Sequence, residues 1–454
     1  MSSRRNLPPG PGNNFPGQQL LAFRRSPTDF LTNVARRYGD ISHFRLGRRA
    51  VYFLNRPEYV KDVLVTHQDN FRKGLALERA KFLFGGGLLT SEGELHRRQR
   101  RLVQPAFQRQ RVAAYAEMMV RHAARVRASW EGVREFDVAR EMRRLTLLVV
   151  CEALFGADVR ADADAVDEAV SSVIRRFQLF PTPWSIARRA LTKLTARASR
   201  RDATTRDKLD AIIFRIIRER QRGGAGGNDL LAMLLAAKDG EPGKDFEPCP
   251  MSDSQVRDEV ITLFMAGHET TANALTWTWH LLSKYPEAEA KFHGELDAVL
   301  AGRLPTAEDA PRLRYTEMVF AEAMRLYPPS WILSRRAVGD YEVGGYALPA
   351  GSLVIVSPYV MHHDERYFPA PRRFDPERWT EASSASRPEY SYFPFGGGAR
   401  RCIGEGFAKL EALLILATLA QVWRLKAVAD EPVELQPGMV LRARHGIRLR
   451  PVRR

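Results

Sequence analysis

Cysteine is scarce in this chain of 454 residues: there are three, Cys151, Cys249 and Cys402, and they lie far apart. So few cysteines exclude a disulfide framework, and their spacing excludes the paired Cys-x-x-Cys arrangement of zinc sites. An odd number of cysteines is typical of a reducing compartment, in which at least one thiol stays available for chemistry.

Long apolar runs are also missing. The longest, residues 412–420, is about half of the roughly 18 residues that a membrane span needs, and it predicts a buried helix. Residues 1–17 are polar and rich in proline, glycine and arginine, without the apolar core of a signal peptide. We therefore predict a protein without a membrane span, located in the cytoplasm.

Acidic residues are outnumbered by basic ones. The chain has 70 lysines and arginines against 53 aspartates and glutamates, a formal net charge of +17. Such an excess is typical of proteins that bind nucleic acid, a membrane surface or an acidic protein. With 44% hydrophobic and 9% aromatic residues, the composition excludes disorder as the main state but does not distinguish these partners.

The pattern of apolar residues predicts a mainly α-helical fold with a small β component. Helices are expected at 29–38, at 316–327, after Cys402 and over much of 95–223, where proline interrupts the pattern at Pro105 and near 181–183. Another long helix is expected to begin at a capping box formed by Ser252 and Gln255 and to end near residue 284. Short strands are expected at 41–46, 50–55, 341–346 and 352–356. The glycine-rich residues 223–227 are interpreted as a loop rather than a linker. We expect a tail at 1–20 and one large domain over 21–454.

Cys402 ends a glycine-rich stretch, residues 395–402, just before a predicted helix. Glycines let a bulky planar group approach the backbone. The first helical turn presents unpaired N–H groups and the positive end of the helix dipole, which favour a thiolate. A thiolate there can be an axial ligand of iron, and Arg400 can pair with a haem propionate. The alternatives are an inert buried cysteine and an anion site.

The longest predicted helix contains Gly267, Thr270 and Thr271 near its middle. Glycine costs a helix roughly 1 kcal/mol relative to alanine, and threonine hydroxyls can bond to the preceding turn and bend the helix. These features indicate a place where the helix opens toward a ligand. Glu269 beside Thr270 supplies an acid and an alcohol, the parts of a proton relay; the alternative is a solvated glutamate in a helix bent for packing.

Glu322 and Arg325 put an acid and a base three residues apart on one helix face. An exposed pair of this kind adds only about 0.2–0.5 kcal/mol to helix stability, so the pair alone indicates no function. The neighbouring His362 and His363 would point apart in an extended chain, which disfavours a metal site.

Together these segments resemble the cytochrome P450 family. The residues at the positions of the family's haem-binding loop are Phe395, Gly396, Gly398, Arg400, Cys402 and Gly404. Residues 266–271 resemble its oxygen-activating helix motif, Glu322 and Arg325 its ExxR motif, and residues 376–379 its PERF segment. The motifs occur in the family's order, and the resemblance extends from about residue 27 to the C-terminus.

The resemblance implies a P450 fold in which Cys402 binds the iron of haem b and O2 is a co-substrate. Thr270 and Glu269 would deliver protons to dioxygen, and Glu322, Arg325 and Arg378 would form a buried structural ion-pair group. The residues expected to contact haem are Cys402, Arg400, Arg335, Arg100, His96, Phe395, Gly396, Gly404, Ala266 and Gly267. His96 stands where the family often has tryptophan.

The resemblance also locates four segments around the substrate: a presumed loop at 77–89, and residues 177–184, 263–266 and 330–332. They are apolar and almost free of charge, which favours a terpenoid, fatty acid or similar lipophilic substrate. The residues expected to line the pocket are Leu88, Leu89, Leu263, Phe264, Ala266, Ser330, Trp331 and Ile332. The alternative for each is ordinary core packing.

Six arginines between Arg97 and Arg111 account for part of the charge. In the family this region docks an acidic electron donor, which predicts a separate ferredoxin or flavodoxin-type partner and no nucleic acid. The predicted protein is a monomeric haem-thiolate monooxygenase that inserts one oxygen atom from O2 into a lipophilic substrate. Two alternatives are a haem-thiolate peroxygenase or hydroperoxide-rearranging enzyme, and a basic helical nucleic-acid-binding protein.

Overall fold

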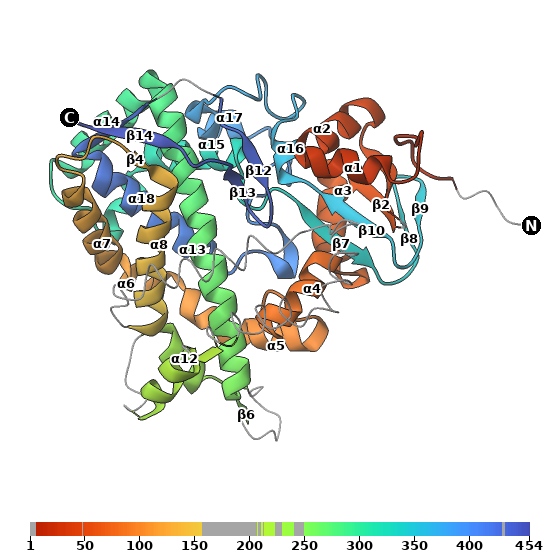
Figure 1. The fold of residues 1–454 in the computed structure, drawn as a ribbon, viewed down its shortest axis with the longest axis horizontal. Helices are drawn as coiled ribbons and strands as arrows, with labels where there is room; N and C mark the ends of the chain where they lie inside the picture. The colour runs from red at the N-terminus through yellow and green to blue at the C-terminus, as the bar shows by residue number, and fades with distance from the viewer. Residues whose placement is uncertain are drawn as a thin grey trace, which may run out of the picture.

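The computed structural model describes residues 6–47, 49–156, 207, 210–211, 213–222, 229–239, 249–428 and 432–454. The expected break near 181–183, the pocket segment 177–184 and the loop 223–227 lie outside the described residues. Helices predominate, as predicted, and one group of strands lies at the end of the molecule that also carries the N-terminal helices (Figure 1).

The helices occupy most of the described chain. They are α1 (Gln18–Arg25), α2 (Pro27–Tyr38), α3 (Pro57–Lys61), α4 (Leu75–Phe84), α5 (Gly93–Val103), α6 (Arg109–Ala114), α7 (Ala116–Ser129), α8 (Val138–Phe155), α12 (Leu230–Ala236), α13 (Asp253–Lys284), α14 (Pro286–Leu300), α15 (Arg314–Leu326), α16 (Pro358–His362), α17 (Glu381–Ser384) and α18 (Glu405–Ala420). Single turns include η1 (Asp62–Thr66), η3 (Gln104–Phe107), η5 (Pro376–Trp379) and η6 (Gly398–Arg400).

The largest sheet joins early and late parts of the chain. Its strand order is β1 (Ile41–Leu46), β2 (Arg49–Leu54), β10 (Leu353–Val356), β7 (Leu333–Ala337) and β3 (Phe71–Lys73). Only the β2–β10 pair in this order is parallel. The β3–β7 register places Lys73 opposite Arg335, so two basic residues are cross-strand neighbours.

The remaining strands form smaller sheets. They are β11 (Trp423–Ala427) with β14 (Arg448–Arg453) and β4 (Phe136–Asp137), and the pairs β12 (Leu435–Pro437) with β13 (Leu441–Ala443), β5 (Lys238–Asp239) with β6 (Cys249–Pro250), and β8 (Tyr341–Val343) with β9 (Tyr346–Leu348). Residues 341–346, expected as strand around glycine turns, contain β8, a turn at Gly344 and Gly345, and the start of β9. Gly344 and Gly345 have φ of 56° and 81°, a conformation that reverses the chain into a hairpin.

The longest helix, α13, runs through the middle of the molecule with α8 alongside it (Figure 1). The capping box predicted at Ser252 and Gln255 is confirmed, because both reciprocal hydrogen bonds are present. α15 and α18 also pack against α13, and the apolar run 412–420 is buried within α18, as predicted. This packing places α13, and with it residues 266–271, at the centre of the molecule.

One sequence-based expectation needs correction near the N-terminus. Residues 77–89 begin as helix α4 rather than as a loop; this segment is rich in strong helix formers and ends at Gly85, whose φ is 62°. The expected boundary at residue 20 falls inside α1. The preceding chain is docked on β1, because the Pro9 carbonyl accepts a 3.0 Å hydrogen bond from His43 N–H.

Within the described parts of the chain, we find no helix with both the length and the apolar character needed to cross a membrane.

Candidate active site

The residues around Cys402 form a tight loop that leads into α18. The Cys402 N–H donates to the Phe395 carbonyl at 2.9 Å, and the Gly396 N–H donates to the Phe393 carbonyl at 3.0 Å. Gly396 and Gly398 have φ of 72° and 63°, which favour glycine. A Cβ at Gly398 would also lie 2.0 Å from the Leu64 carbonyl oxygen, so the loop packs directly on η1. A Cβ at Gly404 would make only ordinary contact with Phe107.

The sulfur of Cys402 is accessible although the residue lies deep among protein groups. Burial raises the pKa of the Cys402 thiol, while the Gly404 N–H and the charges of Arg100 and Arg401 act in the opposite direction. The helix end thus favours a thiolate, as expected, but desolvation outweighs its effect on the pKa. A metal cation bound to the sulfur would stabilise the thiolate directly.

A short stretch of α13 is accessible within an otherwise buried helix. Ala266 is exposed, and Gly267 and Thr270 are partly exposed, whereas both preceding turns are buried. The Thr270 hydroxyl donates to the Ala266 carbonyl at 2.6 Å, and the Thr271 hydroxyl donates to the Gly267 carbonyl at 3.1 Å, as predicted. The helix nevertheless continues unbroken through these residues.

Gly267 has a packing role that the sequence did not reveal. A Cβ at this position would lie 2.8 Å from a side-chain methyl of Val150, on the facing helix α8. The glycine thus permits close approach of two helices. Glu269 is not solvated, contrary to the alternative considered from sequence: it is 1% exposed and its carboxylate lies 2.6 Å from the guanidinium of Arg442.

A second group of predicted residues forms a buried cluster of positive charge. Arg335 makes a hydrogen bond to the Ser334 carbonyl at 3.1 Å, and burial lowers its pKa to about 10. Burial also lowers the pKa of its cross-strand neighbour Lys73 to about 6, with the charge of Arg400 acting in the same direction. Arg400 pairs with Glu92, and burial lowers the pKa of Arg400 as well.

Helix α5 contributes the other two predicted haem contacts. Arg100 donates to the carbonyl of Arg401 at 2.8 Å, which joins α5 to the Cys402 loop, and burial lowers its pKa. His96 is 4% exposed, and burial, reinforced by Arg400 and Lys73, lowers its pKa to about 3. His96 is therefore a neutral hydrogen-bonding group in this cluster.

This arrangement of side chains fits a haem. Burial lowers the pKa of Arg335, Arg400 and Arg100, so each guanidinium would be stabilised by an anionic partner. Among the described residues Glu92 is the carboxylate that pairs with Arg400. Two propionates would balance the remaining positive charge. An accessible cysteine sulfur supplies the soft ligand that iron accepts in haem-thiolate proteins.

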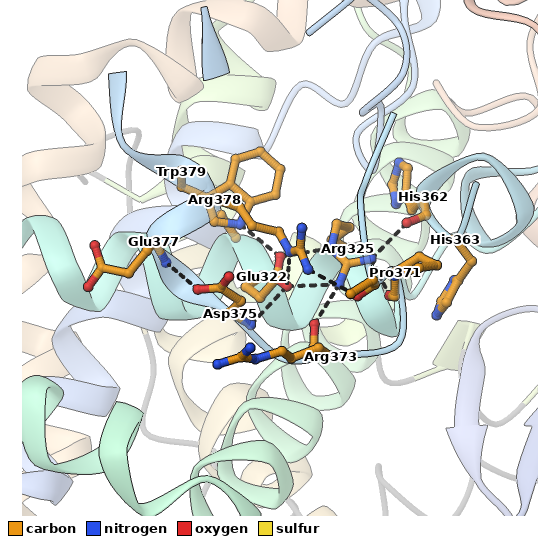
Figure 2. A network of polar contacts seen from close by, with 12 residues as sticks. Glu322, Arg325, His362, His363, Pro371, Arg373, Asp375, Glu377, Arg378 and Trp379 are labelled. Carbon is orange, nitrogen blue, oxygen red and sulfur yellow. Dashed lines mark hydrogen bonds and ion pairs between the residues drawn. The ribbon is translucent and has the colours of Figure 1, made fainter. Parts of the chain in front are cut away.

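Glu322 and Arg325 form a fully buried ion pair, with both side chains 0% exposed. Arg325 binds the two carboxylate oxygens of Glu322, each at 2.8 Å, and donates its remaining N–H groups to the carbonyls of His362, Pro371 and Arg373 (Figure 2). All five guanidinium donors are therefore used.

Glu322 has further donors beyond Arg325 (Figure 2). Arg378 donates at 3.3 Å, the Asp375 N–H at 3.1 Å and the Trp379 indole N–H at 3.0 Å. The bond from Trp379 is one that phenylalanine, present in the family's PERF segment, cannot make. The group thus includes more residues than the three expected from the resemblance.

His362 connects this ion pair to the Cys402 loop. Its carbonyl accepts from Arg325 at 2.8 Å, and its Nε2 accepts from the Phe393 N–H at 3.1 Å. Tyr392 adds a second connection, because its hydroxyl donates to the Ala321 carbonyl of α15 at 3.1 Å. The backbone that begins the loop is therefore held by the Glu322–Arg325 region.

The predicted pocket residues fall into two groups. Leu89, Leu263 and Phe264 belong to one hydrophobic cluster between α8 and α13. Trp331 is 1% exposed, donates to the Gly438 carbonyl at 2.9 Å and packs with Ile332 in another cluster beside the largest sheet, so its contacts are those of core packing.

Leu88 and Leu89 lie on a loop that is tied to α13. Asp258 accepts from the Gly86 N–H at 2.7 Å, and Glu259 accepts from the Leu88 N–H at 3.0 Å. Burial raises the pKa of Glu259 to about 7. Ser330 is partly buried.

Sequence reasoning missed four residues of this region: Lys73, His362, Trp379 and Arg442. Lys73, His362 and Arg442 have no local signal, because each is defined by a partner far away in the chain. Trp379 alone had a hint, since an indole N–H in a buried segment requires an acceptor.

Fold and site together define a haem-thiolate protein, and the comparisons with known proteins agree. A family model described as Cytochrome P450 matches residues 8–450, so this chain belongs to the cytochrome P450 family. It is 41% identical to a cyclooctatin synthase of Streptomyces melanosporofaciens, over 97% of this chain and 94% of that protein. It is 34% identical to a pentalenene oxygenase of Streptomyces avermitilis, over 94% of this chain and 92% of that protein.

A solved structure agrees with these relatives. A crystal structure of the cytochrome P450DA heme domain superposes with a TM-score of 0.87 at 26% identity, covering 99% of this chain and 98% of that one. The predictions of a P450 fold, a haem cofactor with O2 as co-substrate, and a monooxygenase are thereby confirmed. The nucleic-acid-binding alternative is discarded.

Proposed function

We propose that this chain oxygenates a terpenoid. Support comes from two Streptomyces relatives, the pentalenene oxygenase and a cyclooctat-9-en-7-ol 5-monooxygenase that is 38% identical over 90% of this chain and 87% of that protein. Both names denote compact carbocyclic skeletons with few polar groups. The apolar cluster that contains Leu89, Leu263 and Phe264 suits such a molecule better than a fatty acid, whose carboxylate needs a polar partner.

A binding screen tests the substrate class. Cyclic terpene hydrocarbons and alcohols should shift the haem spectrum at micromolar concentration and give a product heavier by one oxygen atom. Fatty acids of similar carbon number serve as the control series. A spectral shift and turnover with fatty acids alone would contradict the proposal.

We further propose a role for each site residue. Cys402 binds the haem iron, and Arg335, Arg400, Arg100 and His96 hold the propionates. When bound, the haem supplies the iron centre at which O2 is reduced and cleaved. The Thr270 hydroxyl, which can donate and accept at once, would hold and transfer a proton at the reaction site, and Glu269 would pass protons toward it.

Thr270→Ala is expected to separate proton delivery from substrate binding. Substrate affinity and haem reduction should stay near wild type, because neither uses the hydroxyl. Loss of a positioned proton-transfer group typically slows its step by about 10²–10⁴-fold, less where water substitutes. The electrons should then form hydrogen peroxide instead of product. The measurement is the ratio of product formed to reduced cofactor consumed, with peroxide quantified alongside. Thr271→Ala is the matched control, and an unchanged ratio in Thr270→Ala would place the proton path elsewhere.

We infer that a separate acidic electron donor, a ferredoxin or flavodoxin-type protein, docks on the basic surface of α5 and α6. Arg97 and Arg109 are exposed, and the bond from Arg100 to the Arg401 carbonyl brings α5 next to the Cys402 loop. Charge complementarity mainly accelerates the encounter of the two proteins. At physiological ionic strength, salt screens the attraction between exposed charges that are more than roughly 8 Å apart. We also infer a cytoplasmic location and a monomeric state. Light scattering on the purified protein would test the monomeric state.

Reversing charge on this surface should slow reduction rather than substrate binding. In the double variant Arg97→Glu and Arg109→Glu, the rate of haem reduction by the donor should fall and lose its salt dependence. The control reverses Arg25 and Arg36, exposed residues of α1 and α2 at the sheet-rich end. Equal reduction rates in both variants would move the docking surface elsewhere.

A further inference from the structure

Glu269 is held by one residue from a distant hairpin. Its Oε1 lies 2.6 Å from Nε of Arg442 in β13, and the Asn273 amide donates to the same oxygen at 3.4 Å. The other oxygen, Oε2, is buried and has no hydrogen-bond partner among the described residues. One oxygen of the carboxylate is therefore anchored, and the second stays available.

The hairpin that carries Arg442 is itself firmly placed. The Leu441 N–H donates to the Pro329 carbonyl at 3.0 Å, and the Trp277 indole donates to the Leu441 carbonyl at 3.3 Å. The Trp331 indole binds the Gly438 carbonyl at 2.9 Å. The backbone next to Arg442 is therefore held by hydrogen bonds to Pro329 and to Trp277, and Trp277 belongs to α13, the helix that carries Glu269.

We propose that Arg442 is a positioning residue of the oxygenation reaction, which fixes the carboxylate of Glu269 through Oε1 so that Oε2 faces the proton path beside Thr270. This inference rests on the proposed role of Glu269. A buried carboxylate without a cation is strongly disfavoured and adopts other orientations. The pair also extends from interior to surface, because the side chain of Arg442 is 16% exposed and that of Glu269 is 2% exposed.

Proton balance is preserved in this arrangement. For each proton delivered, the Glu269 carboxylate first takes one proton from solvent on the side of Arg442 and then passes it toward Thr270, so it ends as the carboxylate with which it began. Arg442 exchanges no proton. Its contribution is geometric, and misplacement of a reacting group by about 1 Å can cost about 10²-fold in rate.

The experiment compares Arg442→Ala, Arg442→Lys and Arg444→Ala. Arg444 follows two residues later and makes an exposed pair with Glu434, so it is a matched control. In haem-loaded Arg442→Ala, product per reduced cofactor should fall about 10- to 100-fold with a matching rise in peroxide. The solvent deuterium isotope effect on turnover should change, while substrate affinity and haem reduction stay constant. Arg442→Lys should restore much of the ratio.

Two further variants separate the possible failures. If Arg442 acts only through Glu269, then Glu269→Gln and the double variant Glu269→Gln with Arg442→Ala should show the same ratio. A wild-type ratio in Glu269→Gln would overturn the role of Glu269 itself. A reduced ratio in Glu269→Gln with a wild-type ratio in Arg442→Ala would overturn only the role of Arg442.

A readout independent of turnover is the thermal midpoint of unfolding in the same four proteins. Non-additive shifts are expected, because the two side chains contact each other. Additive shifts would show that the ion pair does not form in solution, which contradicts the proposal. If Arg442→Ala does not fold, Arg442→Lys is used for the test instead. Its ratio of product to reduced cofactor consumed should lie between those of wild type and Glu269→Gln. A ratio as low as that of Glu269→Gln would contradict the proposal.

Discussion

Replacing Cys402 with alanine is expected to abolish oxygenation. The substitution removes the sulfur that we propose as the ligand of the haem iron, and among the described residues we find no cluster of side chains that could hold a metal ion in its place. Reduced wild-type protein treated with carbon monoxide should show the red-shifted Soret band of a thiolate-ligated haem. The band should be missing in Cys402→Ala, and turnover should fall to the background rate.

Cys151→Ala is the matched control for this prediction. Cys151 lies in α8, is 3% exposed, and burial raises its pKa to about 12, so it behaves as a small apolar side chain. This variant should keep the band. A haem-loaded Cys402→Ala protein with a normal band would refute the ligand assignment.

Arg325→Ala should yield protein that retains little haem. The substitution leaves the fully buried Glu322 without its bidentate partner and three backbone carbonyls without a donor. Removing one partner of a buried ion pair costs about 3–5 kcal/mol, a large share of the 5–15 kcal/mol by which proteins are typically stable. Because Arg325 also binds the carbonyl of His362, whose ring holds Phe393, the Cys402 loop should loosen.

The measurements are the ratio of haem to protein and the thermal midpoint of unfolding. Arg325→Lys should be intermediate, because an ammonium has three donors against five in a guanidinium. Lys291→Ala removes an exposed pair with Glu377 and should change neither quantity. Full haem content in Arg325→Ala would show that the loop holds without this network.

The sequence alone was sufficient for features that depend on neighbours along the chain. The capping box at Ser252, the backbone bonds of Thr270 and Thr271, and the break at Pro105 are local, because each involves residues within about one helical turn. The spaced motifs around Cys402 and Glu322 led to the family, which the comparisons confirm. Reaction class and cofactor therefore followed from the sequence.

Tertiary structure decided everything that depends on burial or on a distant partner. Lys73 meets Arg335 only through the β3–β7 register, and Arg442 meets Glu269 only because the β12–β13 hairpin is bonded to α13. The pKa of Cys402 is raised because desolvation exceeds the effect of the helix end, and Gly267 is explained by the approach of Val150. Periodicity and local propensity describe one element at a time, whereas desolvation and ion pairing depend on which elements the folded chain brings together.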